Sequence, residues 1–174
     1  MLVGLNVTIP YKQVVIPYLD ELDEHAKAMG AVNVVKVETR EDGTKHLKGY
    51  NTDWYGFTEA FRPMLQVYHH QALILGTGGA SKAIAYSLDR MGISYKFVSR
   101  KPIDGGFTYE DLTEEVIKNY TIIINTSPVG TFPNVKECPN LHYNCITDKH
   151  VVYDLIYNPI KTLFLRQAEI CGAA

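Results

Sequence analysis

Three glycines stand close together in the segment LILGTGGASKA, between an apolar run and a stretch with helical spacing: Gly76, Gly78 and Gly79. A phosphate group fits such a place, because small residues let the backbone come close and the first turn of a helix offers free N–H groups at the positive end of its dipole. A glycine cluster alone is weak evidence, but the strand before it and the helix after it raise its weight. We therefore predict a phosphate-binding loop, with a glycine turn made only for tight packing as the alternative.

The next apolar run ends in VSRKP, where a dinucleotide site would contact the ribose. Sites for NAD usually carry Asp or Glu at this position, which accepts a hydrogen bond from the 2′-hydroxyl. This sequence has Arg100 and Lys101 there and no acid. Because a guanidinium can bind a 2′-phosphate through two hydrogen bonds, the pattern favours NADP over NAD. The alternative is that both residues are solvated surface charges.

The segment GLNVTIPYK, residues 4–12, places polar side chains on a short apolar strand. Asn6 and Thr8 share one face of the run, and Lys12 follows a proline where the strand should leave its sheet. Taken alone, a lysine at a strand end is most often a solvated charge. Asp53 is equally ambiguous, because either Thr52 or Asp53 can serve simply as the N-cap of the helix that begins there.

The elements that must position these residues form two blocks, with a boundary near residues 62–71. In residues 1–62 we expect short strands at 5–9, 32–38 and 46–50 and helices at 19–29 and 51–61. Glycine is expected to end the first helix and to occupy the turn of the hairpin at 40–44, because both places need a positive φ.

Residues 71–174 alternate more regularly between apolar runs and helical patterns. We expect strands at 72–75, 94–99, 121–125 and 151–156 and helices at 78–92, 109–119 and 162–171. Continuous apolar strands are typical of a sheet covered on both faces. Strands that alternate with helices of this length predict βαβ units, a parallel sheet and right-handed crossovers.

Composition narrows the class of protein. The 174 residues are enough to bury a real core, and 46% of them are hydrophobic. A net charge of −2 gives no basic face for nucleic acid or an anionic membrane. From the sequence we expect neither a membrane span nor a charged-then-apolar leader, and the odd number of cysteines without CxxC spacing favours reduced thiols over zinc. We expect a cytoplasmic protein without a bound metal.

With these features in view, the sequence resembles the shikimate dehydrogenases along essentially its whole length. The segments that carry the resemblance, in family order, are GLNVTIPYK, GAVN, GYNTDWYGF, GTGGASKA, VSRK, INTSPVG and YDLIYNP. The resemblance implies an α/β fold, with a Rossmann-like parallel-sheet NADP-binding domain at 71–174 preceded by a partial α/β substrate-binding domain at 1–62. It also implies an NADP-dependent oxidoreductase that reversibly reduces 3-dehydroshikimate to shikimate in aromatic amino-acid biosynthesis.

The resemblance also assigns roles to single residues. It makes Lys12 and Asp53 a proton-transfer pair, since an ammonium held by a carboxylate can protonate a ketone oxygen while NADPH supplies the hydride. Substrate-binding roles fall on Thr8, Asn33, Asp53 and Tyr157. Cofactor-binding roles fall on Gly76, Thr77, Gly78, Gly79, Ala80, Ser99, Arg100, Lys101 and Leu155.

Two departures from the family pattern leave alternatives open. Ser99 stands where asparagine is usual and Lys101 where threonine is usual, so dual use of NADP and NAD stays an alternative. Family members also carry a serine pair for the shikimate carboxylate before this segment and a substrate-binding glutamine after it. We therefore expect a fragment that is at most weakly active and can form a homodimer through an exposed sheet edge. The competing functions are a quinate/shikimate dehydrogenase that uses NAD and a non-catalytic dinucleotide-binding sensor.

Overall fold

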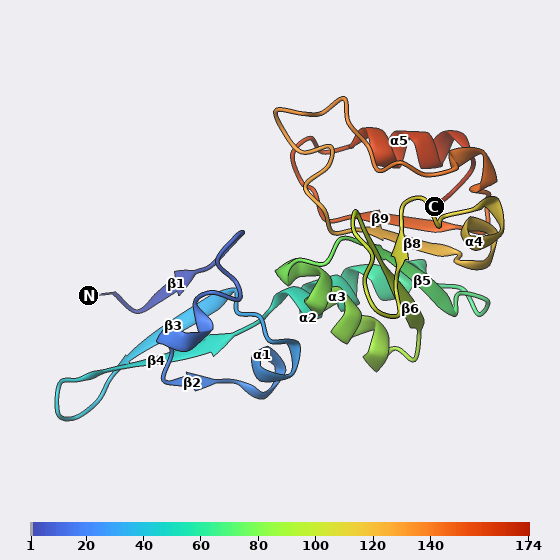
Figure 1. The fold of residues 1–174 in the computed structure, drawn as a ribbon. Helices are drawn as coiled ribbons and strands as arrows, with labels where there is room; N and C mark the ends of the chain where they lie inside the picture. The colour runs from blue at the N-terminus through green and yellow to red at the C-terminus, as the bar shows by residue number, and fades with distance from the viewer. Residues whose placement is uncertain (1) are drawn as a thin grey trace.

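The computed structural model describes residues 2–174 and shows two lobes, each built on its own sheet (Figure 1). The N-terminal lobe holds a four-stranded sheet in the order β1-β3-β4-β2. The second lobe holds a five-stranded sheet in the order β7-β6-β5-β8-β9. The strands are β1 (Gly4–Asn6), β2 (Glu21–Leu22), β3 (Val34–Thr39), β4 (Lys45–Tyr50), β5 (Gln71–Leu75), β6 (Ser94–Ser99), β7 (Phe107–Thr108), β8 (Ile122–Asn125) and β9 (Val151–Asp154).

The predicted hairpin forms the centre of the N-terminal lobe. Strands β3 and β4 pair antiparallel, and Gly43 takes a φ of +83° in the turn between them, as expected. Helix α1 (Glu24–Met29) covers one face of this sheet; its N-cap Asp23 accepts a hydrogen bond from the Ala26 N–H. The helix ends at Gly30, with a φ of +61°, which confirms the predicted stop.

Two elements of this lobe are shorter than the sequence predicted. The helix expected at 19–29 begins only at Glu24, because the backbone N–H groups of Asp20 and Asp23 donate to carbonyls of β4 and hold the chain beside that strand as β2. The strand expected at 5–9 ends at Asn6. Beyond it the chain enters a series of turns over residues 9–15, which carries Lys12.

The second lobe is the predicted parallel α/β domain. All of its strand pairs are parallel, and the chain starts at β5 in the centre and builds outward on both sides. This is the order of a Rossmann-like sheet, and ligands of such sheets bind at the carboxyl ends of the strands where the direction of building reverses. The helices are α2 (Asp53–Phe61), α3 (Gly79–Arg90), α4 (Glu114–Asn119) and α5 (Leu163–Ile170).

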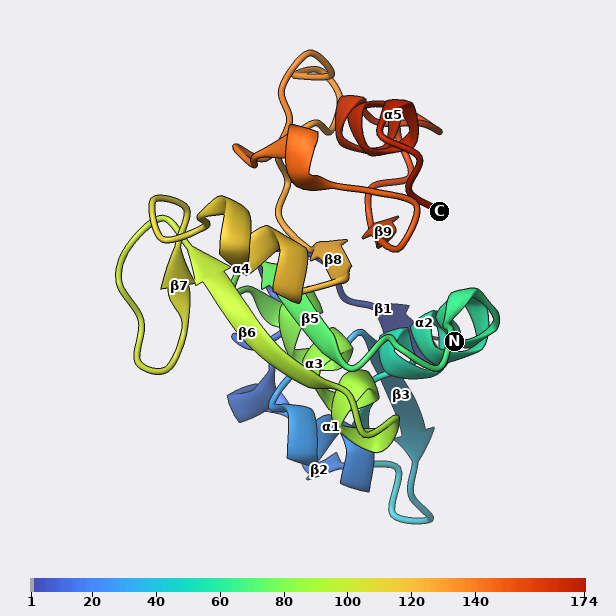
Figure 2. The same cartoon turned by 90° about the vertical axis from the view of Figure 1, so that its right-hand side faces the viewer.

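Helices cover both faces of the parallel sheet (Figure 2). Ala72 and Ile74 of β5 face a core shared with α2 and α3, whereas Leu73 and Leu75 face a core shared with α4 and α5. All four of these β5 side chains are fully buried, as expected for a central parallel strand. Helix α2 comes from residues before the expected boundary at 62–71, and its packing extends the core of the second lobe.

One predicted helix of this lobe is shorter than expected, and one strand was not predicted. The helix expected at 109–119 begins at Glu114, capped by the Thr113 side chain. Before it, the Asp111 carboxylate accepts hydrogen bonds of 2.7 Å from both the N–H and the hydroxyl of Thr108. Such local side-chain bonds compete with the helix, and they leave residues 107–108 free to pair with β6 as the edge strand β7.

Within residues 2–174, no helix combines the length and apolar character that a membrane span requires. The same residues contain no group of three or more His, Cys, Asp or Glu side chains placed to hold a metal ion. The cysteines Cys138, Cys145 and Cys171 are free.

The packing of α2 predicts which of its faces matters for stability. Phe61 is 0% exposed and stacks on Phe57, with ring centroids 4.8 Å apart. Phe61→Ala should lower the free energy of unfolding by about 3–5 kcal/mol, because it leaves a cavity in the core. Tyr55→Ala, on the exposed face of the same helix, should change it by less than about 0.5 kcal/mol. Urea unfolding of both variants measures the difference, and equal losses would contradict this assignment of the faces.

Candidate active site

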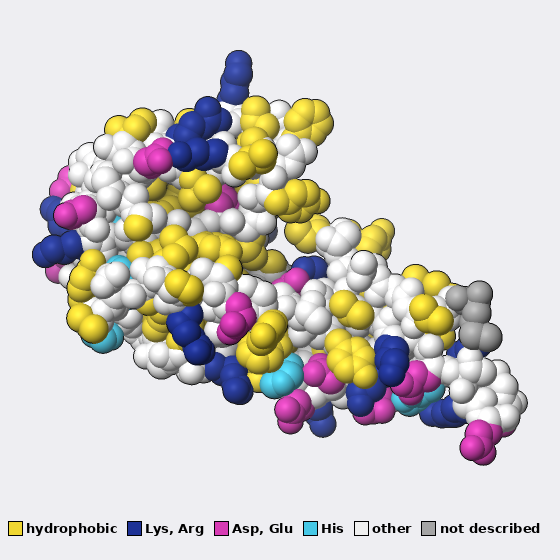
Figure 3. Space-filling view, turned by 180° about the vertical axis from the view of Figure 1, so that it is seen from behind, with side chains coloured by type: hydrophobic (Ala, Val, Ile, Leu, Met, Phe, Trp, Pro, Cys, Tyr) yellow, Lys and Arg dark blue, Asp and Glu magenta, His cyan; other side chains and the backbone are white. Residues whose placement is uncertain are grey.

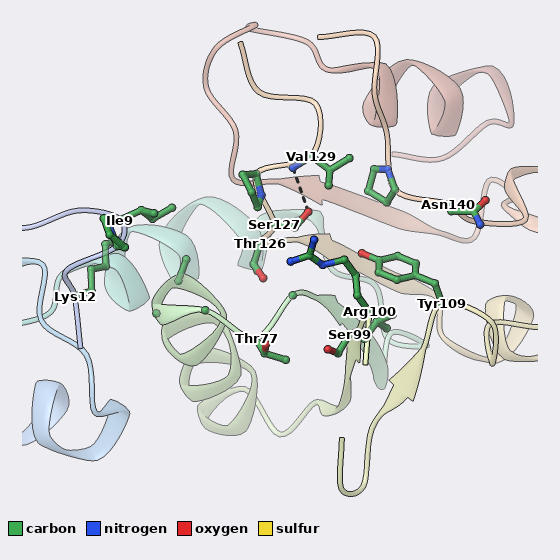
Figure 4. A pocket seen from close by; sticks show the side chains of 18 of the residues that line it. Ile9, Lys12, Thr77, Ser99, Arg100, Tyr109, Thr126, Ser127, Val129 and Asn140 are labelled. Atoms are coloured by element: carbon green, nitrogen blue, oxygen red, sulfur yellow. Dashed lines mark hydrogen bonds between the residues drawn. The ribbon is translucent and has the colours of Figure 1, made fainter. Parts of the chain in front are cut away.

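A cavity of about 570 Å³ lies at the carboxyl ends of the parallel strands. Its floor is the glycine loop after β5, and Ile9, Pro10, Lys12 and Gln13 of the N-terminal lobe close one end. Seen from behind, the molecule has a hollowed face, and apolar side chains gather in the hollow (Figure 3). Figure 4 shows Lys12 toward one end of the cavity, Arg100 and Tyr109 toward the other, and Thr77 of the glycine loop between them.

The glycine loop has the geometry that a phosphate requires. Gly76 has a φ of +114°, and a Cβ at this position would come within 2.9 Å of Thr126 Oγ1. Gly78 occupies the N-cap position of α3, and being a glycine it offers no side-chain oxygen to the first N–H groups of the helix. These N–H groups and the positive end of a helix of 12 residues are therefore available to an anion. Residues 76–80 all line the cavity, and their binding of a cofactor stays a prediction.

The strand end at VSRKP contributes two of its three expected residues. Ser99 and Arg100 line the cavity, whereas Lys101 is exposed and does not. The Lys101 N–H donates to Ser99 Oγ over 3.3 Å, which holds the chain in a turn after β6. The guanidinium of Arg100 thus stands at one end of the cavity, and among residues 2–174 no acidic side chain lines the cavity.

Other lining residues were missed by the sequence reasoning. Tyr109 lies beside Arg100 in Figure 4. Burial raises the pKa of the Tyr109 phenol, a shift that the nearby Arg100 partly opposes. Its position was expected inside a helix, so no pattern in the sequence indicated it. Four further missed residues lie before or within the parallel sheet: Ile9, Pro10, Gln13 and Val98. The others lie on loops after β8: Thr126, Ser127, Pro128, Val129, Cys138, Pro139 and Asn140. The segment INTSPVG was a signal for Thr126, Ser127, Pro128 and Val129 only, and no motif indicated the residues at 138–140.

At the other end of the cavity Lys12 forms an ion pair. Its Nζ donates to Asp53 Oδ2 over 2.7 Å, and the side chains are 14% and 31% exposed. The second carboxylate oxygen, Asp53 Oδ1, accepts from Asn33 Nδ2 over 2.8 Å. The carboxylate is thereby oriented from two sides. An ammonium held in this way can donate a proton, or a hydrogen bond, to an oxygen that develops negative charge.

Three backbone segments bring this group together. The Lys12 carbonyl accepts from the Val32 N–H over 2.7 Å, which fixes the turn against the N-terminal sheet. Asn33 Oδ1 accepts from the Thr52 N–H over 2.9 Å, and Asn51 Oδ1 accepts from the Asp53 N–H over 3.0 Å. Thr52 holds the N-cap position of α2 without a side-chain cap bond. The Asp53 side chain turns instead toward Lys12 and Asn33.

The remaining expected site residues lie outside the cavity lining. Thr8 is exposed in the segment after β1. Leu155 is partly buried against the core shared with α2 and α3. Tyr157 is 90% exposed, so the described residues hold it against no partner in the site.

A partly buried carboxylate, that of Asp154, anchors the loops on the side of β8 and β9. Asp154 accepts hydrogen bonds from Asn125 Nδ2 over 3.1 Å, from the Ile156 N–H over 3.0 Å and from the Thr162 hydroxyl over 2.6 Å. Burial raises the pKa of Asp154, although these hydrogen bonds oppose the shift. Asn125 Nδ2 also lies 3.4 Å from the Val129 carbonyl, which ties this anchor to the cavity wall.

Comparison with known proteins gives a consistent set of relatives. The family model described as the shikimate dehydrogenase substrate binding domain matches residues 1–35. A shikimate dehydrogenase (NADP(+)) of Caldicellulosiruptor bescii is 39% identical over 98% of the chain and 62% of that protein. The chain spans slightly less than two thirds of the length of such relatives. The resemblance to shikimate dehydrogenases is thereby confirmed over 98% of the residues of this chain.

Solved structures agree with the sequence matches. Shikimate 5-dehydrogenase of Thermus thermophilus, in complex with NADP(H) and shikimate, has a TM-score of 0.80 and 30% identity and matches 98% of this chain and 64% of its own. Quinate dehydrogenase of Corynebacterium glutamicum, in complex with NAD, has the same TM-score, identity and coverage. Together with the parallel sheet these confirm the predicted fold class.

The raised pKa of Asp154 predicts a pH dependence of stability. Since its folded-state pKa lies above the unfolded value of about 3.9, the stability that it contributes is full below that pH and is lost as the pH rises through the folded-state value. The free energy of unfolding of wild type minus that of Asp154→Asn should therefore fall as the pH rises from about 4. Urea unfolding at several pH values measures this difference.

Asp111 supplies a control of opposite sign. Hydrogen bonds from the Thr108 hydroxyl and N–H lower the pKa of Asp111. The difference between wild type and Asp111→Asn should thus grow as the pH rises, because a lowered pKa contributes stability above the unfolded value. Two differences that move in the same direction with pH would show that the Asp154 assignment is wrong.

Proposed function

We infer that this chain belongs to the shikimate dehydrogenase family and propose that it carries the site of reversible, NADP-dependent reduction of 3-dehydroshikimate to shikimate. The observation that carries the proposal is the Lys12–Asp53 ion pair at one end of a cavity whose floor is a phosphate-type glycine loop. A dinucleotide stretched along this cavity would have its phosphates at α3 and its reactive ring toward Lys12. The similarity to enzymes with this activity supports the same conclusion.

Cofactor binding is assigned to three parts of the cavity. Residues 76–80 would hold the diphosphate through backbone N–H groups, and the close approach at Gly76 fits that role. Arg100 and Ser99 would hold the ribose 2′-phosphate, since a guanidinium supplies paired donors. Leu155 and Lys101 enter the proposal through the resemblance rather than through a contact with the cavity. When bound, the reduced cofactor supplies the hydride.

Lys12 is proposed as the proton donor in the direction of ketone reduction. Its ammonium would give a proton to the carbonyl oxygen of the substrate and recover one from solvent, and in the reverse direction the neutral amine would accept the hydroxyl proton. Asp53 orients Lys12 through the 2.7 Å contact and keeps one oxygen for Asn33. In a substrate complex, Asn33, Asp53 and Thr8 offer polar groups for ring hydroxyls, a pairing that rejects analogues without them. Tyr157 joins this set on the resemblance alone.

A second candidate is an NAD-dependent quinate/shikimate dehydrogenase, which the equal structural similarity to quinate dehydrogenase favours. One fold therefore serves more than one substrate and cofactor. The choice between the two candidate functions depends on the residues of the site. Arg100 supports NADP, as does the lack of an acid among the described residues that line the cavity. A non-catalytic sensor would have no need for the oriented Lys12–Asp53 pair. A homodimer through the open edge of β1 stays a prediction, as β1 is the outermost strand of its sheet.

Replacing Lys12 tests the proposed chemistry. Lys12→Met keeps an unbranched side chain and removes the ammonium, so kcat for shikimate oxidation with NADP+ should fall about 10²–10⁴-fold, while the Kd for NADP+ changes little. The matched control is Lys118→Met, whose side chain is 60% exposed on α4 and should leave kcat unchanged. Nicotinamide absorbance measures turnover. Full turnover by Lys12→Met, or a wild-type chain that neither binds NADP+ nor turns over, would contradict the proposal.

Replacing Arg100 tests the choice of cofactor. Arg100→Ala should lower the preference for NADP+ over NAD+, expressed as the ratio of kcat/KM values, by about 10–100-fold, because a charged hydrogen bond contributes about 1.5–3 kcal/mol. Lys101→Ala should change this ratio by less than about threefold, since its exposed side chain is screened by solvent. A wild-type preference for NAD+, unaffected by Arg100→Ala, would favour the second candidate instead.

A further inference from the structure

The aliphatic part of Lys12 packs on the glycine loop of the other lobe. A Cβ added at Gly79 would lie 3.1 Å from Lys12 Cβ, 3.6 Å from Cδ and 3.8 Å from Cγ. The first distance is tighter than ordinary van der Waals contact, so an alanine at this position would require Lys12 to yield by a few tenths of an ångström. The lysine therefore occupies space that a side chain at position 79 would need.

We propose that Gly79 is a positioning residue for Lys12, a role that rests on the proposed function and goes beyond the binding of diphosphate. The missing side chain at this point of the loop sets how closely the turn carrying Lys12 approaches the cofactor cavity. The loop that would bind the cofactor and the residue that would donate the proton are thus in direct contact. Their relative position depends on a glycine contact across the two lobes.

Lys12 has few ways to relieve a clash at this place. The tightest contact is at its Cβ, the side-chain atom closest to the backbone, so a change of rotamer further along the chain does not remove it. Its carbonyl is held by the Val32 N–H, and its ammonium is held by Asp53. A displacement of the Lys12 backbone therefore has to disturb at least one of these contacts.

The glycines around the site differ in what surrounds them. Gly76 needs its positive φ and is packed against Thr126. Gly78 has open space where a Cβ would lie, which leaves room for a ligand at the N-terminus of α3. Gly79 has no positive φ, and the contact at its missing Cβ is Lys12. Backbone conformation therefore does not explain the glycine at position 79, whereas the close contact with Lys12 does.

The test compares two Gly→Ala variants near the site. Gly79→Ala should lower kcat about 3–10-fold, because a shift of a few tenths of an ångström is a fraction of the 1 Å displacement that costs about 100-fold. The Kd for NADP+, measured by fluorescence titration, should change much less than kcat. The matched control is Gly56→Ala on the exposed face of α2, where a Cβ meets nothing within 4 Å, and it should leave kcat unchanged.

A second readout does not depend on turnover. Reductive methylation of Lys12, followed by peptide mass spectrometry, should be faster in Gly79→Ala than in wild type and Gly56→Ala, because the ammonium is displaced from Asp53 and from its 14% exposed position. If wild type shows no turnover but this difference is seen, the positioning role stands and the proposed function fails. Unchanged methylation of Lys12 in Gly79→Ala, with or without weaker binding of NADP+, would overturn the positioning role.

Discussion

The ion pair between Lys12 and Asp53 joins the two sheets of the molecule. Lys12 belongs to the turn after β1, and Asp53 begins the helix α2, which packs on the parallel sheet. A lysine ammonium with little access to water needs a charged partner, since an unpaired charge there would lose most of its hydration. The two lobes therefore have to be placed so that Lys12 reaches Asp53. The cavity lies next to this contact.

Helix α2 belongs both to the hydrophobic core and to the candidate site. Phe57 and Phe61 fix one face of this helix in the core, and its first residue carries the carboxylate. The ring centroids of Trp54 and His25 lie 4.6 Å apart, and His25 Nδ1 lies 2.8 Å from the Tyr86 hydroxyl. These aromatic contacts link α1, α2 and α3. The lobes are thus held together by the Lys12–Asp53 ion pair and again by the contacts of His25 with Trp54 and Tyr86.

The sequence was sufficient where the fold depends on local pattern. Continuous apolar runs predicted β5 and β8, and the glycine spacing placed the loop before α3. It was insufficient where neighbours distant in sequence decide the structure. Glu21–Leu22 reads as helix but is held beside β4, and Tyr109 reads as helix but lies on the cavity wall because Asp111 binds Thr108 locally. No periodicity of a single segment contains either contact.

The glycine loop shows the same limit within one motif. A pattern of Gly76, Gly78 and Gly79 reads as a single device for approaching a phosphate, because the motif records only where side chains are absent. What each absence permits depends on the atoms opposite it: Thr126 for Gly76, open space for Gly78 and Lys12 for Gly79. Only the third of these belongs to the other lobe. A motif that is read as cofactor binding can therefore also position the residue that we propose as the proton donor, and that residue lies far away in the sequence.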